Sequence, residues 1–451
     1  MSDTLRRGAC PTLLHPMQTG DGLLVRLMPT GATIPCEAFV ALSAAARSQG
    51  NGIIEITSRG SIQIRGLTEA SLERFAGGLG GIGVQFSEGT PVLCGPLAGI
   101  DARETLDSVA VTMELRRAIA ADHCATALAP KVTVAIDGGG TLHLGAVAAD
   151  ARLRADPATG PSFLHVAVGG DAASETPIGA IAIRHVVDAV VRILHVIAAR
   201  GRAARARDIV ATEGADAFRS AIADLLVDLP PPPPRPPTDP VGEHLLGNGC
   251  VATGVGLAFG HADSTALGRL ARTAADAGAT GIRTAPARTL LIVGLTAKSA
   301  RRLTEEAERL GFIVRGEDPR RRIVACAGAP ICAAGQIPAR SFAPMLAGVA
   351  ALASDGTTIV HLSGCPKGCA CPRPTALTVV GIDGRAGVVV NGSARDPPLA
   401  MMTLDALPAA LSRLEEVMRG LRARDDGAAE ALSRFDRAHI ARLIRGEATR
   451  A

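Results

Sequence analysis

Two segments far apart in the chain share one pattern of apolar and polar positions. They are "GIIEITSRGSIQIRGLTEASLERFAGGLGGIGVQF", from Gly52, and "GIRTAPARTLLIVGLTAKSARRLTEEAERLGFIV", from Gly281. In each, an apolar stretch, an arginine-bearing turn and a second apolar stretch lead to "GLT", which predicts two strands followed by a helix. We expect these helices to end at glycine, Gly77 in the first segment and Gly311 in the second.

The flanking residues extend the pattern. Thr68 and Thr296 of "GLT" can cap the helices that follow, and helix-like segments precede the repeats at Glu37–Arg47 and Ala266–Ala277. Apolar stretches, "GLLVRL" and "VGLAF", come before those segments. The order strand, helix, strand, strand, helix is typical of a ferredoxin-like unit, and its recurrence predicts a duplicated α+β fold.

A longer segment follows each repeat. The first contains "LAPKVTVAIDGGGTLHLGAVA", which predicts a strand pair around a glycine turn, and then a long amphipathic helix near Ile183–Arg200. The stretch "DLPPPPPRPPTDP", Asp228–Pro240, predicts an extended linker because each proline lacks a backbone donor. The predicted parts are an N-terminal segment with the first ferredoxin-like half-domain (1–88), a large α+β domain (89–228), a Pro-rich linker (229–244), a second half-domain (245–317) and a second large α+β domain (318–451).

The composition of the chain adds to this picture only by excluding some classes of function. The chain has 451 residues, 47% of them hydrophobic, as in a globular protein with substantial cores. Its 47 basic and 43 acidic side chains give a net charge of +4, so we expect no nucleic-acid partner. Trp and Tyr are absent, and no glycine-rich stretch has the spacing of a dinucleotide or phosphate loop.

The amino-terminal "MSDTLRRGAC" leads into no apolar signal segment, and no uncharged apolar run reaches membrane-spanning length. We therefore expect a cytoplasmic protein without a membrane partner. In a reducing compartment, clustered cysteines indicate metal or redox chemistry more often than disulfides.

Five of the ten cysteines fall in two short stretches, "ACAGAPICAAG" and "SGCPKGCACP". Cys326 and Cys332 are separated by five residues, and Cys365 and Cys369 by three. Two such pairs can supply the four thiolates of a 4Fe-4S cluster, and the small residues between them let backbone N–H groups approach its sulfurs. A zinc site is the nearest alternative, but its ligand pairs usually lie two to four residues apart. The remaining alternative is unliganded, buried cysteine.

The two motifs, five-spaced and then three-spaced with "SGCPKGC", resemble the cluster-binding signature of the sulfite and nitrite reductase family, whose chains have the same duplicated half-domain plan. Within this family the chain most resembles the precorrin-3B synthases. Four stretches carry the similarity: "RRGACPTLLHPMQTGDGLLVRLMP", "GPLAGID", "PKVTVAIDGGG" and "CPKGCACPRP". The resemblance covers nearly the whole chain.

The resemblance implies cations that hold an anionic tetrapyrrole. Arg59 in "TSRGSIQIRG" and Lys131 in "LAPKV" match positions of such contacts, and Arg65 and Arg288 are further candidates. Arginine suits this task because it can bind a carboxylate through two parallel hydrogen bonds. The alternative for each residue is an ordinary solvated charge.

Two positions depart from the family pattern. The reductases carry a second lysine two residues after the first, where this chain has Thr133, and this difference weakens a sirohaem-binding interpretation. In the synthases the residue two after the last cluster cysteine is typically histidine, and here it is Cys371. Cys371 could be a spare ligand, a near neighbour of the cluster or a packing residue. We favour the last two, since four ligands are already present.

The remaining cysteines and the histidines give weaker signals. Isolated cysteines are expected to be small core side chains, although Cys10 lies in a synthase-like stretch; they are Cys10, Cys36, Cys94, Cys124 and Cys250. The resemblance also implies a mononuclear non-haem iron. Its ligands could come from His15, His123, His143 and His361, but no spacing singles one out, and no catalytic residue is assigned.

The expected function, implied by the resemblance, is an iron–sulfur monooxygenase of cobalamin biosynthesis. It would hydroxylate precorrin-3A with dioxygen and form a lactone, with electrons from an external donor, such as an NAD(P)H-dependent reductase. The alternative is a sirohaem-dependent sulfite or nitrite reductase. A noncatalytic electron-transfer or tetrapyrrole-carrier protein would need only the cluster and the basic pocket.

Overall fold

The computed structural model describes residues 11–29, 33–351, 359–422 and 437–447. The chain forms two compact units, each assembled from several segments. The first unit is built from Met1–Met17, Leu24–Val255 and Asp263–Leu310, and the second from Gln18–Leu23, Gly256–Ala262 and Gly311–Ala451.

The first predicted repeat lies mainly in the first unit and has the expected order of elements. Strand β2 leads into helix α1, strands β3 and β4 form a hairpin, and α2 follows, with β4 between β2 and β3 in the sheet. The bounds are β2 (Gly22–Leu27), α1 (Cys36–Gln49), β3 (Ile53–Ile56), β4 (Ile62–Leu67) and α2 (Glu69–Gly81), with β1 (Met17–Thr19) before them.

The second repeat has the same order. Its four-stranded sheet runs β11-β12-β15-β14. The bounds are β11 (Gly242–Leu245), β12 (Val251–Gly256), β13 (His261–Asp263), α7 (Ser264–Asp276), β14 (Gly281–Ala285), β15 (Thr289–Leu295) and α8 (Ala297–Arg309). The strand and helix pattern of the sequence is therefore present twice.

Both predicted threonine caps are present. Thr68 and Ser71 form a reciprocal capping box at the start of α2, and Thr296 Oγ1 accepts a hydrogen bond from the backbone of Ser299 at 3.2 Å. The expected end of the first helix at Gly77 is wrong, because α2 continues to Gly81. The last five residues of α2 include four glycines, each costing about 1 kcal/mol relative to alanine in a helix interior. Leu79 is the one buried side chain among them, at 4% exposed, and its burial offsets part of this cost.

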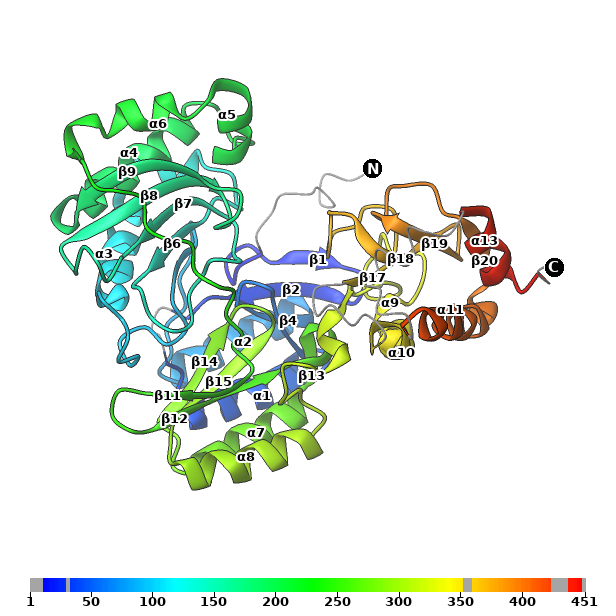
Figure 1. Ribbon diagram of the computed structural model, residues 1–451. Helices are drawn as coiled ribbons and strands as arrows, with labels where there is room; N and C mark the ends of the chain where they lie inside the picture. The colour runs from blue at the N-terminus through cyan, green and yellow to red at the C-terminus, as the bar shows by residue number, and fades with distance from the viewer. Residues whose placement is uncertain (1–10, 30–32, 352–358, 423–436, 448–451) are drawn as a thin grey trace. The chain divides into compact units, whose positions relative to one another are not determined.

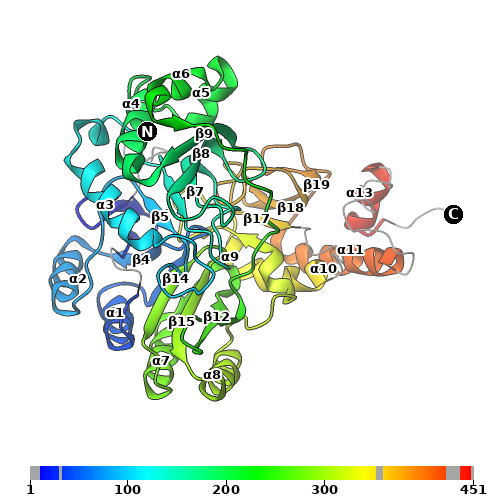
Figure 2. The same cartoon turned by 60° about the vertical axis from the view of Figure 1, so that its left-hand side comes forward.

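The two half-domains pack together within the first unit. Helices α1 and α7 lie side by side (Figures 1 and 2). Ile34 and Ile282 exchange two backbone hydrogen bonds of 2.8 Å. The backbone N–H of Ala287 donates to the carbonyl oxygen of Ser58 at 3.1 Å, so that the two arginine-bearing turns are neighbours.

The first unit also contains a six-stranded sheet of order β10-β9-β8-β7-β6-β5. Helices α3 and α4 cover one face, where apolar residues of alternate strand positions form the core. The bounds are β5 (Val92–Cys94), α3 (Ser108–Ala121), β6 (Val134–Asp137), β7 (Ala149–Arg154), β8 (Phe163–Gly170), β9 (Thr176–Ala182), α4 (Val186–Ala198), α5 (Ala206–Glu213), α6 (Asp216–Ala221) and β10 (Leu226–Val227).

The strand pair expected around "DGGG" is wrong. Residues 138–148, all of them described, contain no strand, and β7 pairs with β6 in parallel rather than as a hairpin. The glycine turn binds elsewhere: Thr105 N–H donates to Gly138 O at 2.8 Å, and Thr141 N–H donates to the carboxylate of Asp101. These contacts direct the segment away from β6. The helix expected at Ile183–Arg200 is α4, preceded by one 3₁₀ turn.

The second unit contains a five-stranded sheet of order β16-β17-β18-β19-β20. Its first three strands are parallel and the last two antiparallel, which is also the sequence of pairings along β5 to β9. The bounds are β16 (Ile323–Ala325), α9 (Ala339–Phe342), α10 (Ala347–Ala351), β17 (Val360–Ser363), β18 (Thr375–Ile382), β19 (Arg385–Gly392), β20 (Ala400–Met402), α11 (Leu407–Arg422) and α13 (Arg437–Arg445).

Within the described residues, every helix is too short or too polar to span a bilayer. The proline-rich stretch 228–240, described throughout, forms neither helix nor strand.

A buried carboxylate anchors the first large sheet. Asp150 on β7 is 1% exposed and accepts hydrogen bonds from Arg205 Nε at 2.9 Å, Arg205 Nη2 at 2.8 Å, Ala206 N at 3.0 Å and Thr133 N at 3.0 Å. It joins β7, the residue before β6 and the start of α5.

We predict that Asp150→Ala destabilises the protein by roughly 3 kcal/mol, because it leaves a partly buried guanidinium and two backbone donors without their acceptor. Asp208→Ala is the control, since Asp208 pairs with Arg207 at an exposed site and should matter by less than about 1 kcal/mol. Calorimetric unfolding of the full chain measures both. Equal unfolding midpoints for the two variants would contradict the anchoring role.

Candidate functional site

The two cysteine motifs begin at the same edge of the second unit's sheet. Cys326 directly follows β16, and Cys365 comes two residues after the end of β17. The parallel register pairs Ala325 with Leu362, and Cys326 N–H donates to Leu362 O at 3.1 Å. Because parallel strands end at a common edge, the motifs meet although almost forty residues separate them.

The first motif folds tightly over the second. Gly364 N–H donates to Cys326 Sγ at 3.0 Å, and Cys332 N–H donates to Gly328 O at 2.7 Å. Gly328 has a φ of 68°, which favours glycine. A Cβ on Gly364 would lie 2.8 Å from Gly328 Cα and 3.3 Å from Cys326 Sγ. The small residues of the motif are therefore required by the close approach of the backbone.

The thiols of the two motifs influence one another. Burial raises the pKa of Cys326, and the neighbouring Cys332 and Cys365 raise it further, while backbone N–H groups of Gly364 and Gly328 oppose this effect. Such a group of thiols ionises readily only when a cation compensates the thiolates. The donor set therefore suits an iron centre.

A separate group of possible ligand side chains lies in the first unit. In the described part of the chain, Asp122, His123 and His195 bring three ligand atoms within 4.8 Å of one another.

The other two cysteines of the second motif differ in environment. Cys369 is exposed and follows Gly368, whose φ of 60° reverses the chain. Cys371 is 5% exposed, and its thiol lies 3.8 Å from the carbonyl oxygen of Arg373 in the same loop. The structure thus brings Cys326, Cys332 and Cys365 together and places Cys369 at the exposed end of their loop.

The candidate substrate-binding cations lie in the first unit. Arg59, in the turn between β3 and β4, donates from Nη1 to Thr133 Oγ1 at 2.9 Å and from Nη2 to Ala148 O at 3.3 Å. Thr133 Oγ1 in turn donates to Lys131 O at 3.0 Å. Thr133 therefore gathers Arg59 and Lys131, two residues 72 positions apart, at the start of β6.

The other two cations are placed differently. Arg65 is 6% exposed on β4, with Nε 3.8 Å from Glu55 Oε1. Arg288, at a φ of 62°, occupies the second repeat's turn, beside the turn that carries Arg59. Lys131 is exposed and Arg59 is half-buried.

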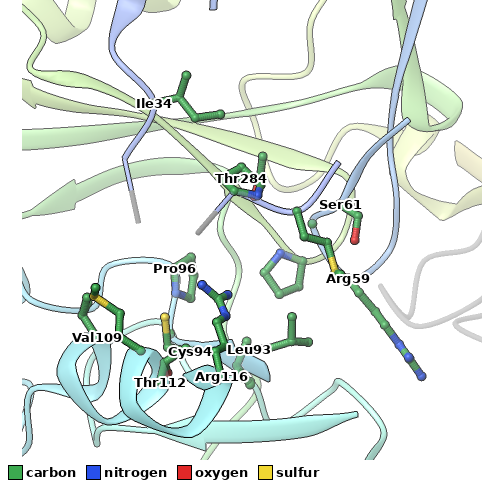
Figure 3. Close-up of a pocket in the computed structure, with 17 residues that line it drawn as sticks. Ile34, Arg59, Ser61, Leu93, Cys94, Pro96, Val109, Thr112, Arg116 and Thr284 are labelled. Carbon is green, nitrogen blue, oxygen red and sulfur yellow. The ribbon is translucent and has the colours of Figure 1, made fainter. Parts of the chain in front are cut away.

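A small pocket of about 90 Å³ lies beneath the Arg59 turn (Figure 3). Cys94, Thr112 and Arg116 line it, and the guanidinium of Arg59 points away from them. Burial raises the pKa of the Cys94 thiol, although Arg116 lowers it, and Arg116 Nη2 donates to Val92 O at 2.9 Å. The guanidinium of Arg59 lies outside this pocket, where it donates to Thr133.

The histidines are dispersed. His143 accepts from Gly145 N–H at 3.0 Å and contacts Pro236 O at 2.8 Å, so that both ring nitrogens are engaged. His123 lies beside Asp122 and His195 at the ends of α3 and α4, on the helix-covered side of the sheet. His361 is fully buried on β17, and His15 is exposed. The ligands of a second iron stay unassigned.

The isolated cysteines vary in burial. Cys36 and Cys124 are buried as expected, Cys94 and Cys250 are half-buried, and Cys10 lies outside the described residues. Sequence reasoning missed the roles of Asp150 and Arg205, which hold Thr133 in place. Their spacing along the chain carries no signal for this contact.

Three comparisons with known proteins bear on this arrangement. The nitrite/sulfite reductase ferredoxin-like half domain matches residues 15–80. The solved structure of the NirA protein of Mycobacterium tuberculosis superposes with a TM-score of 0.74 and 23% identity, covering 93% of this chain and 84% of that one. These two findings confirm the duplicated α+β plan.

A relative from Sinorhizobium sp., named precorrin-3B synthase, is 38% identical over 437 residues, which are 97% of this chain and 94% of the relative. The chain is therefore an enzyme of the precorrin-3B synthase family, with the fold of the nitrite and sulfite reductases.

Proposed function

We propose that this protein hydroxylates precorrin-3A with dioxygen and closes a lactone, as a precorrin-3B synthase of aerobic cobalamin biosynthesis. The observation that carries the proposal is the similarity along 97% of the chain to a precorrin-3B synthase. In this reaction one oxygen atom of dioxygen enters the substrate and the other leaves as water. Two electrons come from an external donor, such as an NAD(P)H-dependent reductase, and we place the reaction in the cytoplasm.

In this proposal Cys326, Cys332, Cys365 and Cys369 ligate a 4Fe-4S cluster. Three observations support this assignment: the two motifs converge at one sheet edge, Cys332 and Cys365 influence the pKa of Cys326, and the backbone N–H of Gly364 donates to Cys326 Sγ. When bound, the cluster would supply single electrons to the reaction. The exposed Cys369 can adjust its position because it follows a glycine turn.

Arg59 and Lys131 are proposed to bind carboxylates of the tetrapyrrole. The hydroxyl of Thr133 orients the guanidinium of Arg59, and the buried Asp150 fixes the backbone of Thr133. A guanidinium that is already oriented loses less side-chain entropy when it binds a carboxylate. Arg288, in the neighbouring turn, could add a third cation beside Arg59 and Lys131. Arg65 is buried beside Glu55 and is the weakest of the four candidates.

The sirohaem reductase is the second candidate, favoured only by the shared fold. Thr133 stands where a reductase would have its second lysine, and its hydroxyl accepts a hydrogen bond from Arg59 instead of adding a positive charge. The site is therefore less cationic than a site for sulfite or nitrite would be. A noncatalytic carrier would bind the tetrapyrrole without converting it, so the absence of turnover would distinguish it from both enzymes.

The first prediction concerns the cluster. Replacing any one of Cys326, Cys332, Cys365 and Cys369 by Ser should remove or degrade it, because serine is a poor ligand for iron in such clusters. Iron and sulfide analysis with low-temperature EPR after reduction measures the outcome. Cys371→Ser is the matched control and should keep nearly the full iron content. A complete cluster in the Cys326→Ser protein would refute the ligand assignment.

The second prediction concerns substrate recognition. Arg59→Met and Lys131→Met should each weaken precorrin-3A binding about tenfold to a hundredfold, the effect of losing one charge-assisted hydrogen bond. Absorbance titration of each variant under anaerobic conditions measures the affinity.

Lys298→Met is the control, because Lys298 is exposed on α8. It should bind precorrin-3A as the unmodified chain does, and all three variants should retain their iron. Unchanged affinity in both Arg59→Met and Lys131→Met would place the binding face elsewhere.

The third prediction separates the two enzymes. With isotopically labelled dioxygen and a reductant, the product should carry one labelled oxygen from the gas by mass spectrometry. We expect no extractable sirohaem and no reduction of sulfite or nitrite with a reduced viologen. Sulfide or ammonia at enzymatic rates, or label derived only from water, would favour the reductase.

A further inference from the structure

A second cavity of the first unit reaches the two arginine-bearing turns at Ser58 and Ala287, but the proposed substrate-binding cations do not line it. It has a volume of about 1010 Å³ and lies between the sheet of β6 to β9 and the proline-rich residues 229–240. Its lining does not include Arg59, Lys131 or Thr133. Helices α3 and α4 cover the other face of this sheet, so the proline-rich segment is the cover of a face that the helices leave open.

The proline-rich segment is held over the cavity by hydrogen bonds at both ends of its central part. Arg154 Nη2 donates to Pro233 O at 2.6 Å, and His143 Nε2 contacts Pro236 O at 2.8 Å. Between them, Arg235 donates from Nη1 to both carboxylate oxygens of Asp137 at 3.1 Å. The prolines cannot donate to the sheet, and this prevents the segment from pairing with it and closing the space.

Most charges around the cavity are already compensated. Arg235 is paired with Asp137, and Arg152 donates to Glu175 and to the carbonyl oxygens of Leu144 and Val147. Arg219 donates to Ile178 O at 3.3 Å. These arginines already donate hydrogen bonds within the protein, and few of their N–H groups are left to bind a ligand.

Two adjacent polar groups differ from the others. His165 is 7% exposed, and within the described chain its Nε2 has no hydrogen-bond partner. Arg154 is its cross-strand partner in the β7–β8 ladder, and among the same residues its Nε is buried without an acceptor. Both residues line the cavity. Buried donors of this kind are normally satisfied, and a ligand acceptor is one way to satisfy them.

The donor groups of His165 and Arg154 favour an anionic ligand. Burial lowers the pKa of His165, so its ring is neutral at neutral pH and can donate from one nitrogen. Arg154 adds a cation beside it, and one carboxylate can accept from both groups. Apart from these two groups and the charged residues that are paired within the protein, the wall includes apolar side chains, such as Leu142, Val147 and Ile178. A cavity of this size and lining suits a small molecule with an apolar body and one anionic end.

We propose that the cavity under residues 229–240 is a binding site for an organic carboxylate, with the carboxylate held by Arg154 and His165 and the apolar body lying along Ile178 and the prolines. This site is separate from the tetrapyrrole contacts of Arg59 and Lys131. It does not depend on the proposed function.

The test uses 2-naphthoate as the probe and isothermal titration calorimetry on the full chain. One saturable site is expected, and neutral 2-naphthalenemethanol should bind at least about tenfold more weakly because it lacks the charge. Inorganic phosphate should not displace the probe, since it has no apolar body. This comparison needs no variant, and absence of saturable naphthoate binding at roughly millimolar concentration would overturn the proposal.

Variants locate the site. Arg154→Met should weaken naphthoate binding at least about tenfold by removing the cation, and Ala167→Phe should abolish it by filling the cavity. Arg59→Met should leave it unchanged, and Arg154→Met should leave precorrin-3A binding unchanged. If Arg59→Met weakens naphthoate binding and Arg154→Met does not, the probe occupies the substrate site and the proposal is wrong. Circular dichroism confirms that each variant is folded.

Discussion

The parallel pairing of neighbouring strands is the constraint that brings the two cysteine motifs together. Strands β16 and β17 end at one edge, with Ala325 opposite Leu362, and the two cysteine motifs begin from these ends. A parallel pair needs a long connection, which here contains α9 and α10. This connection separates the motifs in sequence while the strands hold them together in space. The close approach of Gly364 to Cys326 Sγ then sets which residues the loops can contain.

The first large sheet has the same order of parallel and antiparallel pairings. The loops that follow its strands, however, contain different residues and make different contacts. Cys94 ends β5, and "DGGG" begins at Asp137, the last residue of β6. The glycine turn is bound by Asp101 and by Arg235 rather than lined with thiols. One half of the duplicated plan can therefore hold a cluster, while the other half provides the cations and a large cavity. Such a division of tasks is possible because the strands, not the loops, carry the stability of each sheet.

A single buried carboxylate links the core of the first unit to the position of Arg59. Asp150 accepts from Arg205, from the start of α5 and from Thr133, whose hydroxyl accepts from Arg59. These contacts run from the core to the surface and position the guanidinium of Arg59. Loss of Asp150 should therefore release this guanidinium as well as destabilise the fold.

The sequence by itself determined the repeats, the threonine caps, the duplicated α+β plan and the two cysteine motifs, because strand periodicity, capping and ligand spacing are local properties. It was wrong where distant residues compete for a local segment. Gly77 does not end α2, which continues to Gly81 and buries Leu79, and the "DGGG" turn binds Asp101 and Thr105 instead of forming a hairpin. Only the tertiary structure decided that Arg59 meets Thr133, that Arg65 is buried beside Glu55, and that Arg154 and His165 share a cavity. Those contacts join residues on different strands, and strand register, set by the packing of the whole sheet, has no signature in the sequence around any one of them.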